Sequence, residues 1–596
     1  MAKRRNNKKA RARGGCESAR SEHPRSRDSE KQAPARQSAE PLQGNPHKRI
    51  AVIGGGAAGL AAAISAARES AIAGAAAQVV VFDADERIGR SILATGNGRC
   101  NFSNASIDAG QYYNSGFVSK ALDALATSCE ALSLSELDEG GDRVRQRPRN
   151  MQPCANASSE DPVLRFFADL GMLWREEGEG RLYPVTGKAS TVVDVLRFAA
   201  RSLGALEACE RRVVRIETPR EGGGLFHLRF SDGSIEHAAS VIVAVGGKHA
   251  FGLDEASPAS QRVRGRSLSP ASGSEVAGGS QTLLPPAYAV KAFRPVLGPL
   301  SVSEQAPRQL DNIRVRALVE LHEGCPSGKK KAEQAGEVLF RSYGVSGICI
   351  FNLSRFAEPG DTLLVNFMPS MDEAACARFI EQRHRRLAAS ASVFPRGAAV
   401  TNEALLRGVL LPVVAHVVLE HAGIGEKEPF EKGAAAKLAA ALTRFPLTVT
   451  GVGDTRQCQV MRGGLAVGQF DPATMESRFD AGLFAAGEAL DVDAPCGGYN
   501  LHWAWASGLL AGRAAAGRLQ GGQSGGQQSG GRQTGGRCGG RQTGCQQAGG
   551  KVADDMAANL DEQAGGTVAN LDEHTRGKVS SSEKHAGGER KPSPLR

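Results

Sequence analysis

Aromatic side chains and long apolar runs are both scarce in this sequence. Phe, Trp and Tyr make up 5% of the 596 residues. No uninterrupted run of 18 or more apolar residues occurs, which argues against a membrane-spanning helix. The twelve cysteines form no CxxC pair, and no His/Cys cluster has zinc-binding spacing. We therefore expect no disulfide framework, no metal, and reduced thiols in a cytoplasmic protein.

Excess basic charge is missing from the centre of the chain. The sequence carries 73 Lys and Arg against 63 Asp and Glu, but residues 1–46 hold 12 against 5 and residues 518–596 hold 11 against 8. The 471 residues between them therefore carry 50 charges of each sign. This balance argues against a domain built around a basic nucleic-acid groove, although the arm 1–46 could still contact polyanions.

Composition also separates a core from two polar ends. Residues 1–46 are rich in Arg, Lys, Ser and Pro, and residues 519–550 form a Gly/Gln/Arg/Ser low-complexity tract. Such segments hold too few apolar side chains to offset the entropy lost on ordering, so we expect a disordered arm over 1–46 and a disordered tail over 518–596. The core is long enough to divide into about three domains.

A β-α-β pattern opens the core. Arg49–Ile53 and Val79–Phe82 have the apolar character of buried strands, and the Ala-rich stretch Leu60–Ser70 between them is typical of a helix. Asp83 ends the second strand, 24 residues after Gly59. A carboxylate there accepts hydrogen bonds from both ribose hydroxyls of a dinucleotide and would repel a 2′-phosphate.

The loop between the first strand and the helix fits the pattern GxGxxG. Gly54 permits the tight turn, Gly56 lets a pyrophosphate approach the backbone N–H groups, and Gly59 lets the helix pack closely on the sheet. The alternative interpretation is a glycine-rich helix cap followed by a solvated aspartate. The strand, the helix and Asp83 together favour the dinucleotide site.

Two further glycine-rich segments indicate a ligand longer than NAD. Residues 85–104 (DERIGRSILATGNGRCNFSN) follow the second strand, where a simple NAD dehydrogenase continues into another crossover helix. Residues 482–501 (GLFAAGEALDVDAPCGGYNL) join a strand to a helix, with Glu488 available to ribitol hydroxyls. The Gly497–Asn500 turn would direct helix N-terminal N–H groups at the N1/O2 edge of a reduced flavin.

The rest of the core changes from strand-like to helical character and back. Strands are predicted at Val213–Ile216, Leu225–Phe230 and Ser240–Val245. A small β-barrel or sandwich is predicted from Ile313–Leu321, Glu337–Phe340, Ile348–Leu353 and Thr362–Phe367. Helical periodicity extends from Met371 to Phe445, and strands and glycine loops return from Leu447 until an Ala-rich helix, Ala504–Ala516.

Several motifs resemble those of a known family. GGGAAGL, GR-x-IL-x-x-G-x-GRCN-x-x-N, FPL-x-VTG, TMESR and GLFAAGEALDVDAPCGGYNL-x-WAW-x-SG are similar to motifs of bacterial NAD(P)/FAD-dependent oxidoreductases, which include aminoacetone-oxidase-family and bile-acid-reductase-like flavoproteins. The resemblance covers about residues 48 to 517, with gaps. It implies an α/β fold with a Rossmann-type FAD-binding domain of the two-dinucleotide-binding type, interrupted by a small β-barrel-like domain and a helical domain.

Composition and this resemblance together predict a basic arm over 1–46, an FAD-binding domain over 47–251 and 447–517, a barrel-like domain over 252–369, a helical domain over 370–446 and a tail over 518–596.

The same resemblance implies roles for individual residues. Gly54, Gly56 and Gly59 would hold the FAD pyrophosphate, Asp83 the adenosine ribose, Val213 the adenine through its backbone, and Glu488 the ribitol. Gly246 would lie at the second strand-to-loop crossing, with Gly498 and Asn500 beside the isoalloxazine. Further cofactor-binding residues are expected at Ala57, Ala58, Arg90, Gly96, Gly98, Arg99, Cys100, Asn101, Gly487 and Leu501.

Three positions and one segment depart from the family pattern. Ser91 stands where Lys is usual, Asn97 replaces the middle glycine of a GGGRCN triplet, and Met461 replaces a Thr. The segment after Lys248 (HAFGLDEASPAS) replaces a loop rich in Gly and Ser/Thr. We expect FAD binding to survive these changes, while the usual substrate and electron donor stay open.

No Ser/His/Asp constellation stands out, so the catalytic residue is open. Tyr343 is a candidate proton donor, with a buried tyrosine bonded to backbone as the alternative. His502 could face the substrate or belong to the first turn of a packed helix, and His249 could lie near the flavin or in an exposed loop. Cys100 and Cys496 could form a redox dithiol, but the missing CxxC spacing favours packing cysteines.

These observations predict an FAD-dependent oxidoreductase. Flavin N5 would pass hydride between a small organic substrate or NAD(P)H and a second acceptor. No second GxGxxG lies between a strand and a helix, so NAD(P)H would bind only transiently as electron donor. The alternatives are an FAD-dependent oxidase that uses O₂ without nicotinamide, and a non-catalytic flavin-binding module with a polyanion-binding arm. We expect a small-molecule substrate, no membrane partner, and no nucleic-acid partner except through the arm.

Overall fold

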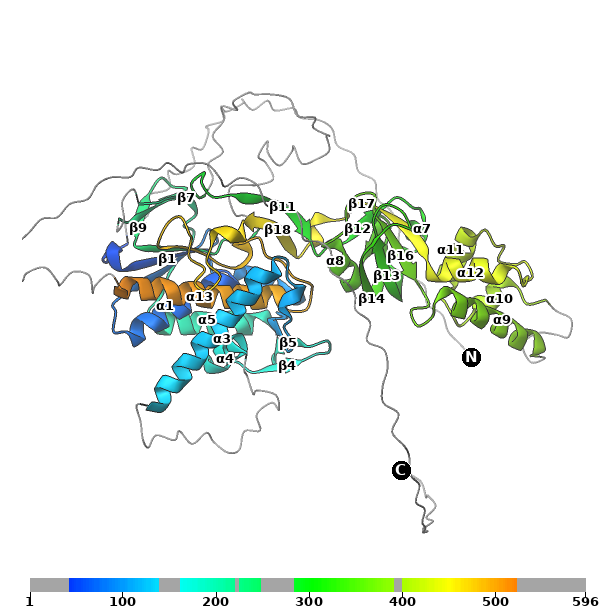
Figure 1. Ribbon diagram of the computed structural model, residues 1–596, viewed down its shortest axis with the longest axis horizontal. Helices are drawn as coiled ribbons and strands as arrows, with labels where there is room; N and C mark the ends of the chain where they lie inside the picture. The colour runs from blue at the N-terminus through cyan, green and yellow to red at the C-terminus, as the bar shows by residue number, and fades with distance from the viewer. Residues whose placement is uncertain (1–41, 139–160, 220–223, 248–282, 391–398, 522–596) are drawn as a thin grey trace, which may run out of the picture. The chain divides into compact units, whose positions relative to one another are not determined.

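The computed structural model describes residues 42–138, 161–219, 224–247, 283–390 and 399–521 (Figure 1). Our predictions for most of the arm 1–46, for nearly all of the tail 518–596, for the segment after Lys248 and for His249 lie outside the described residues. No helix among the described residues has the length and apolar character needed to cross a bilayer.

A parallel five-stranded sheet forms the centre of the nucleotide-binding part. Its strands, in spatial order, are β19 (Leu483–Ala485), β10 (Ser240–Val243), β1 (Arg49–Ile53), β2 (Gln78–Phe82) and β6 (Leu206–Ala208). Every neighbouring pair is parallel. β1 is buried along its whole length, which explains its unbroken apolar sequence. The predicted Rossmann-type α/β fold is confirmed.

Two small-residue helices pack against each other along this sheet. α1 (Ala57–Ile72) and α13 (Tyr499–Gly521) lie side by side (Figure 1). A Cβ atom on Gly508 would lie 2.4 Å from the carbonyl oxygen of Ala58, and one on Gly512 would lie 2.2 Å from that of Ala62. The glycines and alanines therefore allow a helix separation that larger side chains would prevent.

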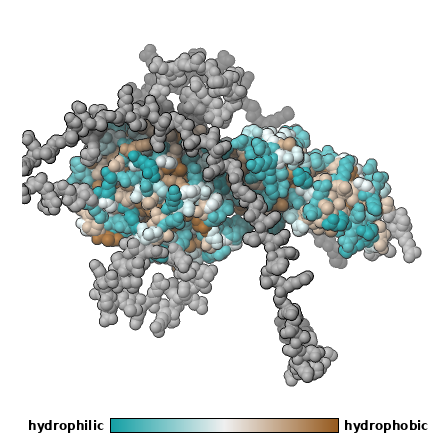
Figure 2. Space-filling model, viewed as in Figure 1, coloured by the Kyte–Doolittle hydropathy of each residue, from teal (hydrophilic) through white to brown (hydrophobic). Residues whose placement is uncertain are grey.

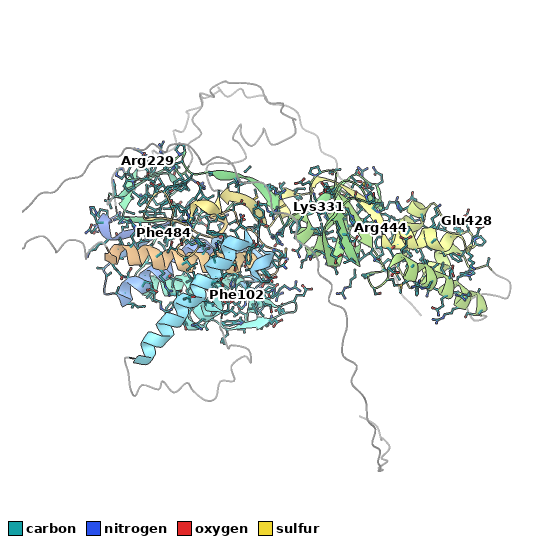
Figure 3. The ribbon with its side chains drawn as sticks, in the orientation of Figure 1. Phe102, Arg229, Lys331, Glu428, Arg444 and Phe484 are labelled. Carbon is teal, nitrogen blue, oxygen red and sulfur yellow. The ribbon has the colours of Figure 1, made fainter. Side chains whose placement is uncertain are left out.

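Two small antiparallel sheets and three more helices complete this part. One sheet comprises β7 (Val213–Glu217), β8 (Phe226–Phe230) and β9 (Ile235–Ala238), and the other β3 (Ser103–Asn104), β5 (Arg181–Pro184) and β4 (Trp174–Glu176). The helices are α3 (Ser115–Asp138), α4 (Pro162–Asp169) and α5 (Ala189–Ser202), with a short α2 (Arg90–Leu93). Phe102 and Phe484, labelled in Figure 3, are both fully buried in this core.

A closed six-stranded barrel is inserted into the nucleotide-binding part. Its strands, in order, are β12 (Leu300–Val302), β15 (Gly344–Ser346), β14 (Lys330–Arg341), β13 (Arg314–His322), β16 (Thr362–Asn366) and β17 (Phe445–Val452). A separate antiparallel ribbon pairs β11 (Val290–Val296) with β18 (Val460–Leu465). β17 pairs with β12 and β16, although we had placed residues from 447 onward in the FAD-binding domain. The division into domains otherwise stays a prediction.

One predicted strand is wrong. Ile348–Leu353 was expected to be β-structure, but the helix α8 (Ile348–Ser354) occupies this segment. Its buried residues Cys349, Ile350, Leu353 and Ser354 follow helical spacing, and a short apolar run does not distinguish a strand from a buried helix. A single helical turn, α7 (Ala306–Gln309), also accompanies the barrel.

Four helices follow the first five barrel strands. They are α9 (Glu373–Ala389), α10 (Asn402–Leu406), α11 (Pro412–Ala422) and α12 (Ala434–Thr443), which agree with the helical periodicity of residues 371–445. Proline opens α11 and Gly423, with φ of +59°, ends it. Hydrophilic residues dominate the visible surface of the described residues (Figure 2).

Candidate functional site

Two of the three glycines of the GxGxxG pattern are packed against backbone atoms and leave no room for a side chain. Gly54 has φ of +102°, and a Cβ there would lie 2.4 Å from the carbonyl oxygen of Ala244 on the neighbouring strand segment. A Cβ on Gly59 would lie 1.8 Å from the carbonyl oxygen of Gly54. Both glycines are therefore required by the fold itself.

Gly56 differs from these two glycines. It precedes α1 in an extended conformation, and a Cβ there would meet only the hydroxyl of Ser91, at 3.0 Å. The first residues of α1, Ala57 and Ala58, present N–H groups that have no partner within the helix. This cradle, which a side chain would fill, fits a pyrophosphate at a helix N-terminus.

The carboxylate of Asp83 lies against the same turn. Its Oδ2 accepts a hydrogen bond of 2.6 Å from the backbone N–H of Gly55, and its Oδ1 accepts one of 2.8 Å from that of Asp85. Asp83 also bonds through its backbone to Ala208 and Arg211, so the segment leading to Val213 on β7 passes beside it. The residues predicted to bind the adenosine ribose and the adenine therefore belong to neighbouring segments.

The loop that follows β2 adopts left-handed backbone at Gly96, Asn97, Gly98 and Cys100. Asn97 has φ of 54°, a conformation that asparagine tolerates better than most residues, so its replacement of a glycine is accommodated. Asn101 carries a buried side-chain oxygen that has no hydrogen-bond partner among the described residues. Because buried polar atoms are nearly always satisfied, this oxygen fits a contact with a ligand.

The two arginines of this loop are engaged with protein groups. Arg99 donates to Glu177 at 2.6 Å and stacks 4.4 Å from the ring centroid of Tyr183. The bond to Arg99 lowers the pKa of Glu177. Arg90 forms an exposed ion pair with Asp85 at 3.2 Å.

Glu488 joins two backbone segments of the opposite half of the site. Its carboxylate accepts hydrogen bonds from the N–H of Gly247 at 3.2 Å and from that of Met461 at 2.8 Å. Gly246 and Gly487, next to these groups, both have positive φ. Met461 takes part through its backbone, so its departure from threonine leaves this bond intact.

The turn that opens α13 contacts the loop that follows β2. A Cβ on Gly498 would lie 2.2 Å from the carbonyl oxygen of Ser103, and the side-chain amide of Asn104 donates to the carbonyl oxygen of Gly497 at 2.9 Å. Asn500 closes the turn by bonding both backbone groups of Ala494, and the partly buried Leu501 packs against the core. The two glycine-rich segments predicted to surround the flavin are therefore brought together.

The catalytic candidates occupy different environments. His502 is buried, and its Nδ1 lies 2.9 Å from the hydroxyl of Ser103, while its Nε2 lies 3.8 Å from Asp161. Burial lowers the pKa of His502. Its place in the first turn of α13 matches the packed-helix alternative. Tyr343, between β14 and β15, has a buried hydroxyl with no hydrogen-bond partner among the described residues.

The family whose description is HI0933-like protein Rossmann domain matches residues 129–514. The chain belongs to this family. It is an FAD-dependent oxidoreductase with FAD as its cofactor, in agreement with the cradle at Gly56 and the oxygen of Asn101.

Relatives align with most of the chain. A 3-dehydro-bile acid Δ(4,6)-reductase from Clostridium scindens is 31% identical over 479 residues, which cover 78% of this chain and 99% of the relative. A ribosomal RNA dihydrouridine synthase from Escherichia coli is 24% identical, with coverage of 76% and 95%. The solved 3-ketosteroid-Δ4-(5α)-dehydrogenase from Rhodococcus jostii is 16% identical, with coverage of 78% and 96% and a TM-score of 0.36.

One buried cluster was not predicted from the sequence. Asp493 lies between Arg355 and Arg462, with a shortest contact of 2.7 Å to Arg355 and 2.5 Å to Arg462. Asp493 belongs to the glycine-rich segment 482–501, and Arg462 follows Met461 directly. Arg355, however, is more than 100 residues away from Arg462 and from Asp493 in the sequence. No sequence pattern connects the three residues.

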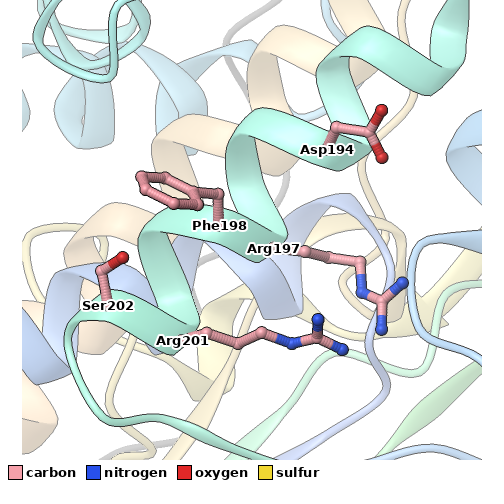
Figure 4. Close-up of a pocket in the computed structure, with 5 residues that line it drawn as sticks. All are labelled: Asp194, Arg197, Phe198, Arg201 and Ser202. Atoms are coloured by element: carbon pink, nitrogen blue, oxygen red, sulfur yellow. The ribbon is translucent and has the colours of Figure 1, made fainter.

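A surface hollow of about 500 Å³ lies on α5 (Figure 4). It is lined by Asp194, Arg197, Phe198, Arg201 and Ser202. Both arginines are bound to Glu207, at 2.6 Å and 2.8 Å. None of the residues we predicted for the cofactor lines this hollow, and it is not the candidate site.

Proposed function

We propose that this protein is a reductase that adds hydrogen across a carbon–carbon double bond conjugated to a carbonyl group in a small organic substrate. FAD, when bound, supplies hydride transfer through N5 between NAD(P)H and that substrate. The support is a relative that is aligned over 99% of its own length and is named for reduction of the Δ4,6 bonds of a 3-dehydro bile acid. In such a compound these double bonds are conjugated to the ketone at C3.

The structural observation that carries the proposal is the approach of Gly498 to Ser103. It assembles the loop after β2 and the N-terminus of α13 at one place. The free N–H groups of the first turn of α13 would stabilise negative charge at the N1/O2 edge of the flavin. Gly56, Asp83, Glu488 and Asn101 would hold the pyrophosphate, the adenosine ribose, the ribitol and the ring.

An apolar cluster provides a candidate wall for the substrate. Val296, Leu297 and Val460 are buried, and Phe351 and Cys496 pack against them while remaining partly exposed. Cys496 directly precedes the Gly497–Gly498 turn, so this cluster lies next to the predicted flavin edge. A flat hydrophobic substrate would bury its surface against such side chains.

Reduction of a conjugated double bond needs a proton as well as a hydride. The hydride adds to the β-carbon and the proton to the α-carbon, so two electrons from NAD(P)H saturate the bond. We assign the proton to the hydroxyl of Tyr343. The ring of this residue lies against Gly453, and its buried hydroxyl has no hydrogen-bond partner among the described residues. Because this hydroxyl is buried, the phenolate would regain its proton from water that enters as the product leaves.

Anaerobic titration tests the proposed function. NADH or NADPH should bleach the bound flavin, and a 3-oxo-4,6-diene steroid should restore its colour while the corresponding saturated 3-oxo steroid should not. Flavin that no nicotinamide bleaches, or that only O₂ reoxidises, would contradict the proposal and favour the oxidase alternative.

Ribosomal RNA should be included as a third acceptor, because a second relative is named for dihydrouridine synthesis in ribosomal RNA. Recovery of the flavin colour with RNA and not with the dienone would indicate that the substrate is a nucleic acid. The equal numbers of acidic and basic residues between positions 47 and 517 favour the small molecule.

A further inference from the structure

A buried ion cluster connects the barrel insertion to the loop that leads to the Gly497–Gly498 turn. Its centre is Asp493, whose side chain is 0% exposed, between Arg355 and Arg462, at 5% and 11%. Arg355 donates from Nε to the carboxylate at 2.7 Å, and Arg462 donates from Nε at 2.5 Å and from Nη2 at 2.9 Å. Both oxygens of Asp493 are thus engaged.

The cluster gathers four segments that are distant in the sequence. Arg355 follows α8 of the barrel insertion, Arg462 lies on β18, and the backbone N–H of Tyr113 donates to the carbonyl oxygen of Asp493 at 2.7 Å. The guanidinium of Arg462 also stacks 4.4 Å from the ring centroid of Tyr113. Arg355 reaches further, from Nη2 to the carbonyl oxygen of Gln111 at 3.0 Å.

A second contact from α8 reaches the same loop. The side-chain oxygen of Asn352 accepts a hydrogen bond of 2.9 Å from the backbone N–H of Cys496. Asn352 and Arg355 are three residues apart, which places them on one side of the helical segment. The barrel insertion is therefore bonded to this loop at two residues, Asp493 and Cys496, and Cys496 directly precedes Gly497.

Stability alone is a weak explanation for such a cluster. Removing charged groups from water costs free energy that their attraction only partly recovers, and apolar residues of similar size often stabilise a protein at least as well. Two guanidinium groups that share one carboxylate instead fix its position from two directions, because Arg and carboxylate groups pair with defined geometry.

We propose that Asp493 is a positioning residue through which Arg355, from the barrel insertion, sets the Cys496–Gly498 segment against the isoalloxazine of FAD. The inserted barrel would then help to position the cofactor, in addition to contacting the substrate. This inference requires FAD binding but does not depend on which substrate is reduced.

Asp493→Asn in the full-length holoenzyme tests this role. The amide keeps the shape but removes the charge, so the two arginines no longer hold the loop. We expect a shifted visible absorption spectrum of the bound flavin, a changed flavin reduction potential, and kcat for NAD(P)H oxidation about 100-fold lower, since misplacement by about 1 Å has that effect. KM for NAD(P)H should stay within about twofold, because a positioning defect acts on the bound complex.

Asp361→Asn is the matched control. Asp361 is a buried carboxylate of the barrel insertion and pairs with Lys331 at 2.8 Å. Among the described residues, its side chain otherwise accepts hydrogen bonds from Gly324 and Glu358, neither of which belongs to the cofactor loops. This variant should lose thermal stability and keep the parent flavin spectrum, potential and kcat. An Asp493→Asn protein that behaves in the same way would overturn the proposal.

Arg355→Lys keeps the proposal testable if Asp493→Asn does not fold. Lysine retains the charge but loses the bonds of Nη2 to Gln111 and to the backbone of Asp493. We expect the same direction of spectral shift and a decrease in kcat of about tenfold. A parent-like spectrum and kcat in Arg355→Lys would count against the proposal.

Discussion

Gly59 lies so close to Gly54 that a Cβ on Gly59 would stand 1.8 Å from the carbonyl oxygen of Gly54. The first glycine of the turn and the first turn of α1 are therefore in direct backbone contact. Gly56, between them, has no such neighbour, since a Cβ there would meet only the hydroxyl of Ser91 at 3.0 Å. The three glycines of the GxGxxG pattern thus divide into those that the fold requires and one that the ligand requires.

Gly56→Val should fold but lose its flavin. The extended backbone at Gly56 accepts a side chain, whereas valine would occupy the space proposed for the pyrophosphate. The ratio of flavin to protein absorbance after purification and the thermal unfolding midpoint of the apoprotein measure the two effects. Gly59→Ala is the contrasting variant, and it should lose about 2 kcal/mol or more of stability because backbone must move. A yellow Gly56→Val protein would refute the placement of the pyrophosphate.

The cysteines near the flavin loops should be chemically inert. Burial raises the pKa of Cys100 to about 11 and that of Cys496 to about 12, and the thiolate is the reactive form. Cys325 is exposed, and its hydrogen bond to Ser327 lowers its pKa. Among the described cysteines, alkylation near pH 8 followed by mass spectrometry should therefore label Cys325 first and leave Cys100 unmodified until unfolding.

A redox dithiol would give a different result from packing cysteines. An anaerobic reductive titration should take up two electrons per flavin, with no long-wavelength charge-transfer band. Uptake of four electrons, or a mass shift of two hydrogens that links Cys100 to Cys496, would restore the dithiol hypothesis that the missing CxxC spacing argues against.

The buried His502 should make stability depend on pH in the acid range. Burial lowers its pKa from the usual 6.5, so below that pH the unfolded chain takes up a proton that the folded chain refuses. Stability should then decrease as the pH falls below about 6.5, by at most about 1.4 kcal/mol per pH unit for this one group, and should not change through His502 at higher pH.

His502→Gln tests this origin of the pH dependence. Glutamine can still bond to Ser103 but does not titrate, so urea unfolding at pH 8 and pH 5.5 with saturating FAD should show a smaller difference than in the parent. His416→Gln, at a half-exposed histidine paired with Glu426 at 2.6 Å, is the control. Equal pH dependence in parent and His502→Gln would place the titrating group elsewhere.

The parts of the site that sequence predicted are those encoded locally. β1, α1 and β2 follow from apolar runs around a glycine turn, and Asp83 follows from its distance to that turn. The approach of Gly498 to Ser103 could be expected only because both segments carried glycine-rich motifs. Local pattern therefore predicted the two segments that we propose to form the cofactor site.

What sequence did not predict depends on long-range pairing. The barrel is closed by β17, which lies beyond the helical segment, and Ile348–Leu353 is helical because tertiary packing decides the state of a short apolar run. The Arg355–Asp493–Arg462 cluster joins residues whose separation leaves no periodicity to detect. Such contacts arise from topology, which composition and spacing do not record.

The contact between α1 and α13 should depend on glycine at one position and not at another of the same helix. A Cβ on Gly512 would lie 2.2 Å from the carbonyl oxygen of Ala62 and 2.9 Å from the Cβ of Ser65, whereas one on Gly517 would have nothing within 4 Å. Gly512→Ala should therefore force the helices apart and cost about 1–3 kcal/mol. Gly517→Ala should stabilise the protein by up to about 1 kcal/mol through helix propensity. Urea unfolding of both variants tests this prediction. If the two substitutions changed the free energy of unfolding in the same direction, close packing of the two helices would not determine the stability of this core.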